Sequence, residues 1–512
     1  MTALWDNPEF IRNVRTQLRP GKVAATACIC VAVSVVAGFA ISNQNPNQVP
    51  TGPYGWGIQI LQTAFWLQAL MLAVGGGIAC INSIHREKEQ NTFDYQRVTR
   101  MTPLELAVGK LFGAPVFTYF VFLCLMPLAL YGMIMGRRPP LTVLAAYAAL
   151  LVSSIMLHAL ALLMSLLAVR GSHTGMILLL LVVLGFSAAG GPGMYFQVYP
   201  FGPFYAPQIA QWGELAPTGN VLPGQWEMAW ARDNFFGQTV LHVPLLLVID
   251  LLLTAWFLLA VVRNIKRDPN YYEIYSPPQA LGFAMFINLL FVAFFRWDVA
   301  KPMDGQSLLL TLNIVVFFAL GLGAMRNRER MRRILRSRES GAASWLDLTW
   351  PAPLMVAGTA AAGLLVVLGM EVGHNPRAEW DLKFALLRLL FFVAWITRDL
   401  QFLQWMSLRR GKHPLVIGIL FMIVFYVCVL MVMAPLGIYS SVDRKAFSAF
   451  FVPSAVYSLD RFMWIQRPAI WGAALVAQCV AIALFIGLQR QTIDELTSHA
   501  STQAHAPVPA QT

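Results

Sequence analysis

Charged residues are scarce in this sequence. Lys, Arg, Asp and Glu together make up 12% of the 512 residues, whereas 57% are hydrophobic. Soluble domains carry about 25% charged residues, so this composition excludes an ordinary soluble protein. A chain of this kind folds in lipid, where no water reaches the backbone and each crossing helix needs roughly 17 to 25 apolar residues.

Signatures of several enzyme and binding classes are also missing. No Gly-x-x-x-x-Gly-Lys-Ser/Thr phosphate loop occurs, so the chain lacks the usual cradle for nucleotide phosphates. The histidines stand singly rather than at ligand spacing, which argues against a metal site and a membrane-embedded enzyme. No soluble basic face with interleaved aromatic residues is present, so we expect no nucleic-acid partner. We also expect no enzyme activity, cofactor or metal in this chain.

All six cysteines fall within apolar segments, so a disulfide framework is excluded. They are Cys28, Cys30, Cys80, Cys124, Cys428 and Cys479. The first twenty residues lack the basic segment and the short apolar core of a cleavable signal peptide. Residues 1–22 instead predict an amphipathic helix on the membrane surface, which Asn7 and Pro8 begin and which is basic along one side.

Apolar runs predict about twelve transmembrane helices, which gives an all-α, polytopic integral membrane protein. The predicted cores are 23–41, 58–81, 112–135, 141–168, 176–190, 240–262, 280–295, 307–324, 352–370, 384–397, 415–434 and 469–488. Lys and Arg concentrate in the segments that face the cytoplasm if both ends lie inside, although Arg137 and Arg138 run against this orientation. The polar composition of residues 489–512 predicts a disordered cytoplasmic tail.

Landmarks of the first half recur in the second. Charged arms follow the second and eighth predicted spans, and later landmarks return after about 240 residues. Each half has a long outside loop, at 191–239 and 435–468, that contains aromatic residues and prolines. We therefore expect two six-helix halves, 23–262 and 280–488, joined by a cytoplasmic linker at 263–279. The alternative is chance spacing in a long helical membrane protein.

The arm after the second predicted span, residues 85–111, has the features of a lever. A highly charged run leads to Thr102 and Pro103, which can begin a helix, and Glu105 suits the positive end of the helix dipole. Such a short rigid helix between two spans can act as a lever. The alternative is an ordinary solvated loop, because charge runs usually are that.

This arm resembles that of the permease subunits of type-2 ABC transporters, which reads Arg-Glu-x-Glu-x-x-Thr, then Thr-Pro-Leu with a following acidic residue, and then Gly-Lys. Residues 7–15 are similar to the amphipathic connecting helix of that family, and the resemblance covers residues 7–262 best. It implies that a separate ABC ATPase subunit docks on the arm and drives export across a cell membrane, such as a bacterial inner membrane. The residues that the resemblance assigns to coupling are Arg86, Glu87, Glu89, Thr92, Asp94, Arg97, Thr102, Pro103 and Glu105.

The second half departs from that pattern. Its arm begins at Arg326 and is strongly basic, and Trp350-Pro351 stands where Thr102-Pro103 stands earlier. The arm residues assigned here by position are Arg328, Glu329, Arg332 and Arg333. The resemblance therefore leaves open whether this half docks an ATPase in the same manner. The other function classes are a secondary transporter, which normally carries more midplane charges, and a scaffold that does not transport.

Ionisable residues are few within the predicted spans, and the clear cases are His158, Asp250 and Arg388. A charge at mid-bilayer is costly unless it is paired or hydrated. For Asp250 the two interpretations are a helix-to-helix contact, with His158 as the expected partner, and a role in proton or substrate handling. So few polar groups suit an amphipathic or lipid-like substrate of unknown identity better than a small ion or a sugar.

Overall fold

The structure is a computed structural model, and it is predominantly helical. It describes residues 4–42, 54–167, 206–207, 209–210, 232–235, 238–267, 272–294, 302–339, 350–372, 378–411, 414–433, 449–451 and 466–504. The sheet among these residues is one short antiparallel hairpin of β1 (Arg232–Phe235) and β2 (Gln238–Leu241). The chain divides into two compact units, Met1–Tyr272 and Glu273–Thr512. That boundary lies within the expected linker at 263–279, and the repetition of one plan in both units stays a prediction.

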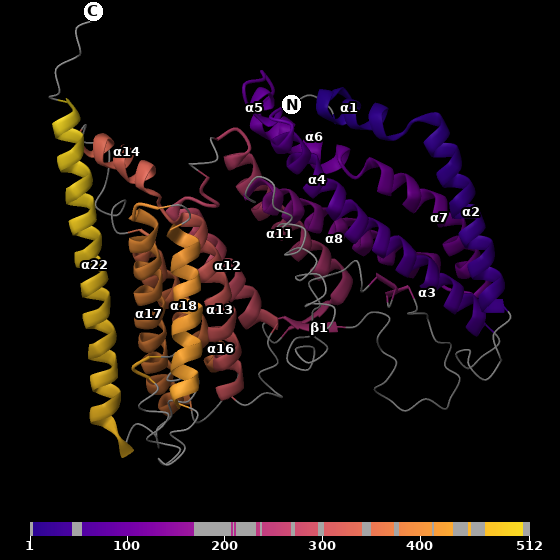
Figure 1. The fold of residues 1–512 in the computed structure, drawn as a ribbon. Helices are drawn as coiled ribbons and strands as arrows, with labels where there is room; N and C mark the ends of the chain where they lie inside the picture. The colour runs from indigo at the N-terminus through magenta and orange to yellow at the C-terminus, as the bar shows by residue number, and fades with distance from the viewer. Residues whose placement is uncertain are drawn as a thin grey trace, which may run out of the picture. The chain divides into compact units, whose positions relative to one another are not determined.

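The first unit contains the amphipathic helix, several long apolar helices and the first arm (Figure 1). Its helices are α1 (Pro8–Gln17), α2 (Pro20–Ser42), α3 (Gly55–Ala69), the π-helical turn η2 (Leu70–Gly75), α4 (Gly76–Glu89), α5 (Phe93–Arg97), α6 (Pro103–Gly113), α7 (Val116–Met135), α8 (Pro140–Leu167) and α11 (His242–Asn264). α8 packs against α4 and α11, and α3 packs along α7. Gly57 allows the close approach of α3 to the end of α7, since a Cβ at this position would lie only 2.3 Å from the backbone nitrogen of Gly136.

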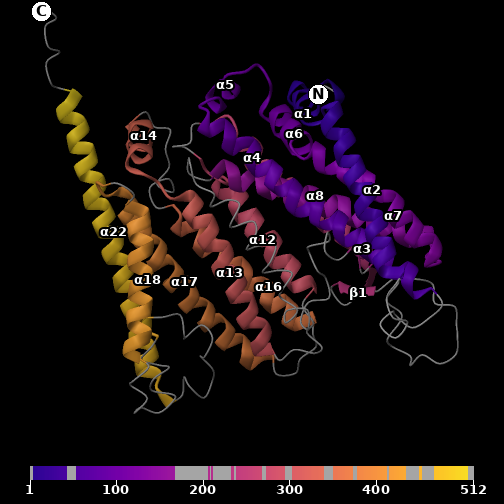
Figure 2. The ribbon, with the colours of Figure 1, turned by 45° about the vertical axis from the view of Figure 1, so that its right-hand side comes forward.

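The second unit is built around one long helix, α17, which packs against α16, α18 and α22 (Figures 1 and 2). Its helices are α12 (Pro277–Phe294), α13 (Pro302–Ala324), α14 (Arg328–Glu339), α16 (Ala352–Val372), α17 (Ala378–Leu408), α18 (Pro414–Met433) and α22 (Pro468–Ala504). α14 turns away from the end of α13 through a bend of 69°. It therefore lies across that end rather than continuing the span.

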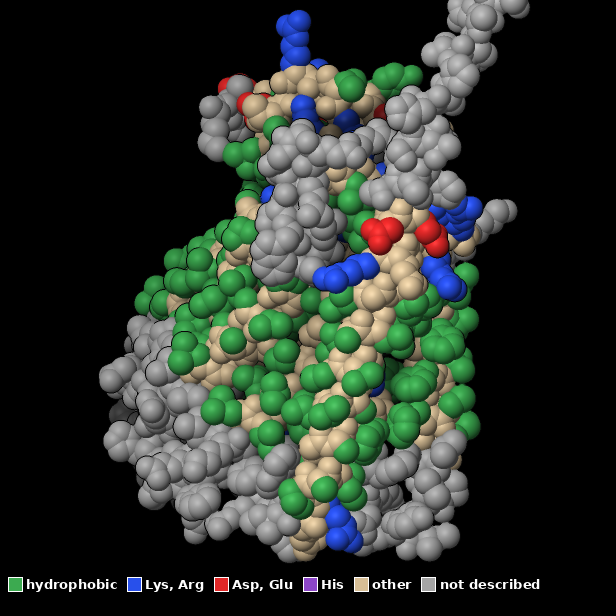
Figure 3. Space-filling model, turned by 90° about the vertical axis from the view of Figure 1, so that its left-hand side faces the viewer, with side chains coloured by type: hydrophobic (Ala, Val, Ile, Leu, Met, Phe, Trp, Pro, Cys, Tyr) green, Lys and Arg blue, Asp and Glu red, His purple; other side chains and the backbone are tan. Residues whose placement is uncertain are grey.

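Within the described ranges, six helices are long and apolar enough to cross a membrane, or seven if the bent pair of α13 and α14 counts as one span. α2, α18 and α22 expose rows of large apolar side chains, which a soluble protein would bury. In the view that faces α22, hydrophobic side chains cover the long middle of the surface and charged ones gather toward its ends (Figure 3). The chain is thus a helical protein of the membrane-spanning type.

Helices occupy each expected core range except 176–190, which lies outside the described residues, as do most of the two long loops. Two expectations differ from the structure. The span expected at 384–397 belongs to α17 and continues to Leu408, because polar residues beyond position 397 are buried against other helices. The tail expected to be disordered from 489 is helical as far as Ala504, because Leu496 packs against Met331 and Leu408.

Candidate functional site

α1 docks on α6 through a polar face, and the two helices lie side by side in both ribbon views (Figures 1 and 2). Asn7 caps α1 as predicted, because its Oδ1 accepts from the backbone N–H groups of Glu9 and Phe10 at 3.0 and 3.3 Å. Its side-chain amide also donates to the Glu105 carbonyl at 2.7 Å. The approach is close because a Cβ on Gly109 of α6 would lie 2.6 Å from the Asn7 Oδ1.

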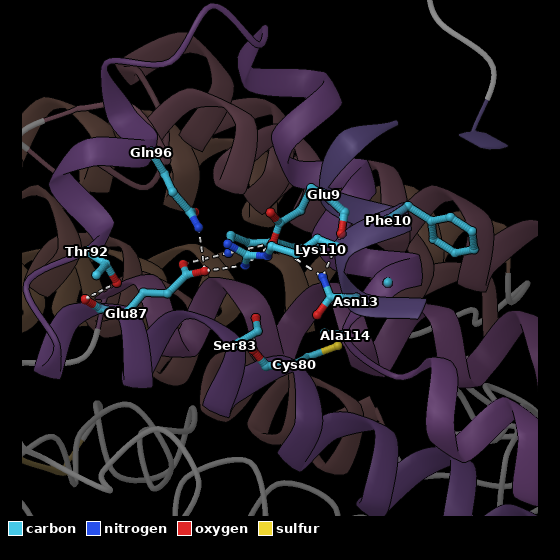
Figure 4. A network of polar contacts seen from close by, with 12 residues as sticks. Glu9, Phe10, Asn13, Cys80, Ser83, Glu87, Thr92, Gln96, Lys110 and Ala114 are labelled. Carbon is cyan, nitrogen blue, oxygen red and sulfur yellow. Dashed lines mark hydrogen bonds and ion pairs between the residues drawn. The ribbon is translucent and has the colours of Figure 1, made fainter. Parts of the chain in front are cut away.

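Four charged side chains from α1, α4 and α6 meet in one cluster (Figure 4). This cluster, called the clamp below, consists of Glu9, Arg12, Glu87 and Lys110. The ammonium of Lys110, a fully buried residue, lies 2.6 Å from Glu87 and 3.2 Å from Glu9. Arg12 bridges the same two carboxylates at 2.8 Å each. Two cations and two anions make the clamp neutral, so the loss of any one side chain leaves a charge unpaired.

The environment of Arg12 favours its charged form. Burial alone lowers the pKa of Arg12, but hydrogen bonds to Glu87 and Glu9 and the charges of both carboxylates outweigh burial and raise the pKa above its ordinary value. The Gln96 amide donates to the Glu87 carboxylate at 2.5 Å, and the Asn13 amide donates to Glu9 at 3.3 Å. These neutral donors add hydrogen bonds to both carboxylates, and additional hydrogen bonds of this kind help to stabilise buried ions.

A tight turn follows α4 and brings α5 back over the clamp. Asn91 adopts the left-handed conformation with φ of 55°, which Asn tolerates better than most residues. The Thr92 N–H and hydroxyl both donate to the Glu87 carbonyl, at 2.9 and 3.3 Å. Because Gln96 also binds the Glu87 side chain, this one glutamate fixes both ends of the turn.

α6 begins with the residues that the sequence predicted. The Thr102 hydroxyl accepts from the Glu105 N–H at 3.2 Å, and the Glu105 carboxylate accepts from the Thr102 N–H at 2.9 Å. Pro103 occupies the first turn, where its missing N–H costs nothing. This reciprocal capping box defines where the arm stops and α6 starts, and it sets the orientation of Gly109 and Lys110 toward α1.

Two lysines tie the arm to further helices of the first unit. The Lys88 ammonium is buried and donates to the carbonyls of Ser165 and Leu166 at 2.8 and 2.7 Å, at the C-terminal end of α8, where the helix dipole favours a cation. Lys266, beyond the end of α11, donates to the Thr99 carbonyl at 2.8 Å. Polar contacts therefore hold the arm to α1, to α8 and to the segment after α11.

The outer side of the arm is exposed and mixes apolar with charged groups. Tyr95 is 75% exposed and Val98 is 81% exposed. Close by in sequence, the side chains of Glu89 and Asp94 are 50% and 66% exposed. Large apolar side chains left on the surface beside charged ones are typical of a contact site for another protein.

The assigned arm residues thus separate into two groups. Glu87, Thr92, Thr102, Pro103 and Glu105 build the clamp, the turn and the start of α6, whereas Arg86, Glu89 and Asp94 stay on the outer side. Arg97 is half-buried and pairs with Asp94 at 2.9 Å. Sequence reasoning did not include Glu9, Arg12 or Lys110 in the site. A signal was present in Lys110, because a lone cation inside an apolar helix needs a buried anion.

The second arm is a different structure. All of its assigned residues, Arg328, Glu329, Arg332 and Arg333, lie on α14. α14 packs through Met331 against Leu408 and Leu496, at the ends of α17 and α22. Asn327 caps it by accepting from the Arg330 N–H at 2.9 Å, and the Arg330 side chain pairs with Glu273 at 3.0 Å.

His158, Asp250 and Arg388 are fully buried, but the expected contact between His158 and Asp250 is wrong. Asp250 accepts a hydrogen bond from Ser153 instead. His158 lies 2.8 Å from the Leu72 carbonyl in the π-helical turn and 3.3 Å from the Tyr119 hydroxyl. A carbonyl only accepts, so the Nε2 of His158 carries the proton and His158 ties α8 to the turn. Arg388 is buried in α17.

A further polar network in the second unit escaped sequence reasoning, because the span there was expected to end at 397. Arg398 of α17 pairs with Asp399 at 2.7 Å and donates to the Tyr426 hydroxyl of α18 at 2.7 Å. It also donates to Gln478 of α22 at 3.0 Å. The network binds three helices through one cation, and the Tyr426 hydroxyl donates to Asp399 in turn.

No known protein family, curated protein or solved structure matches the chain. Among the residues that the structure describes, no group of three or more His, Cys, Asp or Glu side chains could hold a metal ion. The clamp and its tethers offer ionic and hydrogen-bonding contacts between helices. Such contacts suit the transmission of motion from the arm into the first unit.

Proposed function

We propose that this chain is the membrane-spanning permease subunit of an ATP-driven type-2 ABC exporter. The observation that carries the proposal is the combination found in the arm. Its inner side is fixed to α1 and α6 by the buried clamp and to α8 and α11 by Lys88 and Lys266. Its outer side exposes Tyr95 and Val98. An ATPase subunit needs an arm of this kind, which is fixed to the membrane helices on its inner side and offers exposed apolar side chains for binding on its outer side.

The proposed assembly has about twelve membrane-spanning helices in two six-helix halves, with both chain ends in the cytoplasm of a bacterial cell. The sequence carries no phosphate loop, so a separate ABC ATPase subunit supplies nucleotide binding and hydrolysis. The scarcity of charged groups within spans favours an amphipathic substrate over a small ion.

Coupling follows from the contacts of the arm. When the ATPase subunits close on ATP, they push on α5 and the turn before it. Glu87 joins that turn to Lys110 of α6 and Arg12 of α1. A displacement of the turn therefore moves both helices directly and is not absorbed by a flexible connection. Lys88 passes the same displacement to the end of α8. The first unit then tilts as one body.

The test removes the exposed apolar contact and leaves the clamp intact. In Tyr95→Ala/Val98→Ala, the ATPase activity that co-purifies with the tagged chain should fall at least about tenfold, because truncating central apolar anchors costs more than 1 kcal/mol each. The matched control is Val476→Ala/Val480→Ala on α22, where both side chains are 62% exposed on the lipid-facing surface. That control should keep full activity.

Two outcomes contradict the proposal. One is a wild-type chain that brings down no ATP-hydrolysing subunit from its native membrane. The other is substrate movement in proteoliposomes that contain the purified chain alone, which indicates a secondary transporter. A non-transporting scaffold would retain the ATPase but show no ATP-dependent flux.

A further inference from the structure

α14 has the placement of a helix at the membrane surface. It follows α13 through a 69° bend, and Met331 and Leu335 on its inner side pack against Leu408 and Leu496. Leu408 is the last residue of α17, and Leu496 lies in the last third of α22, which passes beside α14 in Figure 1. An amphipathic helix across the ends of spans lies at the level of the lipid headgroups.

One flank of α14 collects positive charge. Arg328 and Arg332 are one helical turn apart, and Arg410, just beyond α17, lies close enough to act on Arg328 electrostatically. Arg328 is also the first residue of α14, where the helix dipole is positive and disfavours a cation. Burial lowers the pKa of Arg328, and the charges of Arg410 and Arg332 lower it further, whereas Glu495 of α22 opposes them.

The arrangement has a donor with no acceptor. The Nε atom of Arg328 is buried and has no hydrogen-bond partner among the described residues. A buried guanidinium N–H without an acceptor is unfavourable, and its natural acceptor is a carboxylate or phosphate oxygen. The flank therefore has the charge and an unused donor for an anion.

The anion is identified by what lies next to the cluster. α18 begins at Pro414, four residues after Arg410, and exposes Val416, Ile417 and Leu420 on its first turns. These side chains belong to the apolar surface that faces lipid acyl chains. A ligand here would contact cations with one part and an apolar surface with another. A phospholipid, which has an anionic headgroup and acyl chains, fits this arrangement better than a soluble anion does.

We propose that Arg328, Arg332 and Arg410 bind the phosphate of an anionic phospholipid in the leaflet on the side where α22 ends. The lipid headgroup fills the place that carboxylates take in the clamp of the first arm. This inference concerns the second unit alone and stands whether or not an ATPase docks on the first arm.

The experiment measures lipid binding to the purified full chain in detergent. Binding of phosphatidylglycerol is titrated against phosphatidylcholine by native mass spectrometry, with inorganic phosphate as a separate ligand. In Arg328→Gln/Arg332→Gln, the affinity for phosphatidylglycerol should fall about 25-fold, since each basic residue at an anionic surface contributes about a factor of five. Arg328→Lys/Arg332→Lys should retain most of the binding, because its charge is unchanged.

The control variant is Arg86→Gln/Arg100→Gln, which removes two exposed cations from the first arm and should leave the affinity unchanged. An equal fall in both glutamine variants would show that net charge alone attracts the lipid, and would overturn the site. Unchanged binding in Arg328→Gln/Arg332→Gln would do the same. Binding of inorganic phosphate as tight as that of the lipid would identify a soluble anion instead. A folded state of each variant is verified by its thermal transition.

Discussion

The first and second arms differ in how their cationic side chains are balanced. In the first arm, Lys110 and Arg12 face Glu9 and Glu87, so the charges cancel within the protein. In the second, Arg328, Arg332 and Arg410 outnumber Glu495, the acid that acts on Arg328. The first arrangement can be buried and rigid, whereas the second needs an outside anion or water.

This difference shows how the two arms of one chain can suit different functions. A neutral cluster whose carboxylates and lysine are buried fixes three helices in one geometry, which suits a part that transmits force. An unbalanced cluster remains open to a ligand and responds to the composition of the membrane. The predictions below test whether burial and charge balance are what separate the two arms.

The largest effect is expected for Lys110→Met. The change leaves Glu9 and Glu87 together with one shared arginine, so a buried negative charge is uncompensated and the free energy of unfolding should fall by about 3 to 5 kcal/mol. Thermal or denaturant unfolding of the purified chain in mixed micelles measures this loss.

The double variant Glu87→Gln/Lys110→Met restores neutrality, because it leaves the Glu9–Arg12 pair at 2.8 Å. It should therefore recover a large part of the stability lost in Lys110→Met. If the double variant is instead as unstable as the sum of the two single changes, charge balance is not what stabilises the clamp. The same loss from Arg332→Gln in the second arm would also erase the contrast between the arms.

A smaller effect is expected for Gly109→Ala. The new Cβ would lie 2.6 Å from the Asn7 Oδ1 and 2.9 Å from the Glu9 Cβ, so α1 must move away from α6 at a cost of about 1 to 3 kcal/mol. Hydrogen exchange should become faster in α1 and remain unchanged in α14. The control is Gly21→Ala, where no atom lies within 4 Å of the new Cβ. Equal destabilisation by both changes would show that close helix approach is not the cause.

Much of the helical framework could be predicted from sequence because apolar length and local capping are encoded by neighbours in the chain. Asn7 and Thr102 each begin a helix with a proline at its first position, and both act as caps in the structure. The apolar core ranges likewise correspond to helices wherever the structure describes them. These features need no knowledge of tertiary contacts.

The clamp could not be predicted in the same way, because Arg12 and Glu9 of α1 lie 75 and 101 positions from their partners Glu87 and Lys110 and pair with them only after α1 has docked. The sequence showed Glu87 as one acid in a charged run, which suggested a solvated residue, whereas the structure buries it. The polar residues after position 397 led to the opposite error, because the predicted span ended too early. Arg398 and Asp399 suggested the end of a span, but each neutralises the other, so α17 continues.

The smallest effect compares the caps of the two arms, Thr102→Ala and Asn327→Ala. Each change removes the side-chain acceptor of a first-turn N–H, at 3.2 Å in α6 and at 2.9 Å in α14, so each should cost about 1 kcal/mol and speed local hydrogen exchange about fivefold. The consequences should differ, because α6 carries Lys110 into the clamp whereas α14 holds the arginine flank. Thr102→Ala should reduce co-purified ATPase activity and leave phosphatidylglycerol binding intact, and Asn327→Ala should show the reverse. If either change affects both readouts equally, the arms do not have separate tasks.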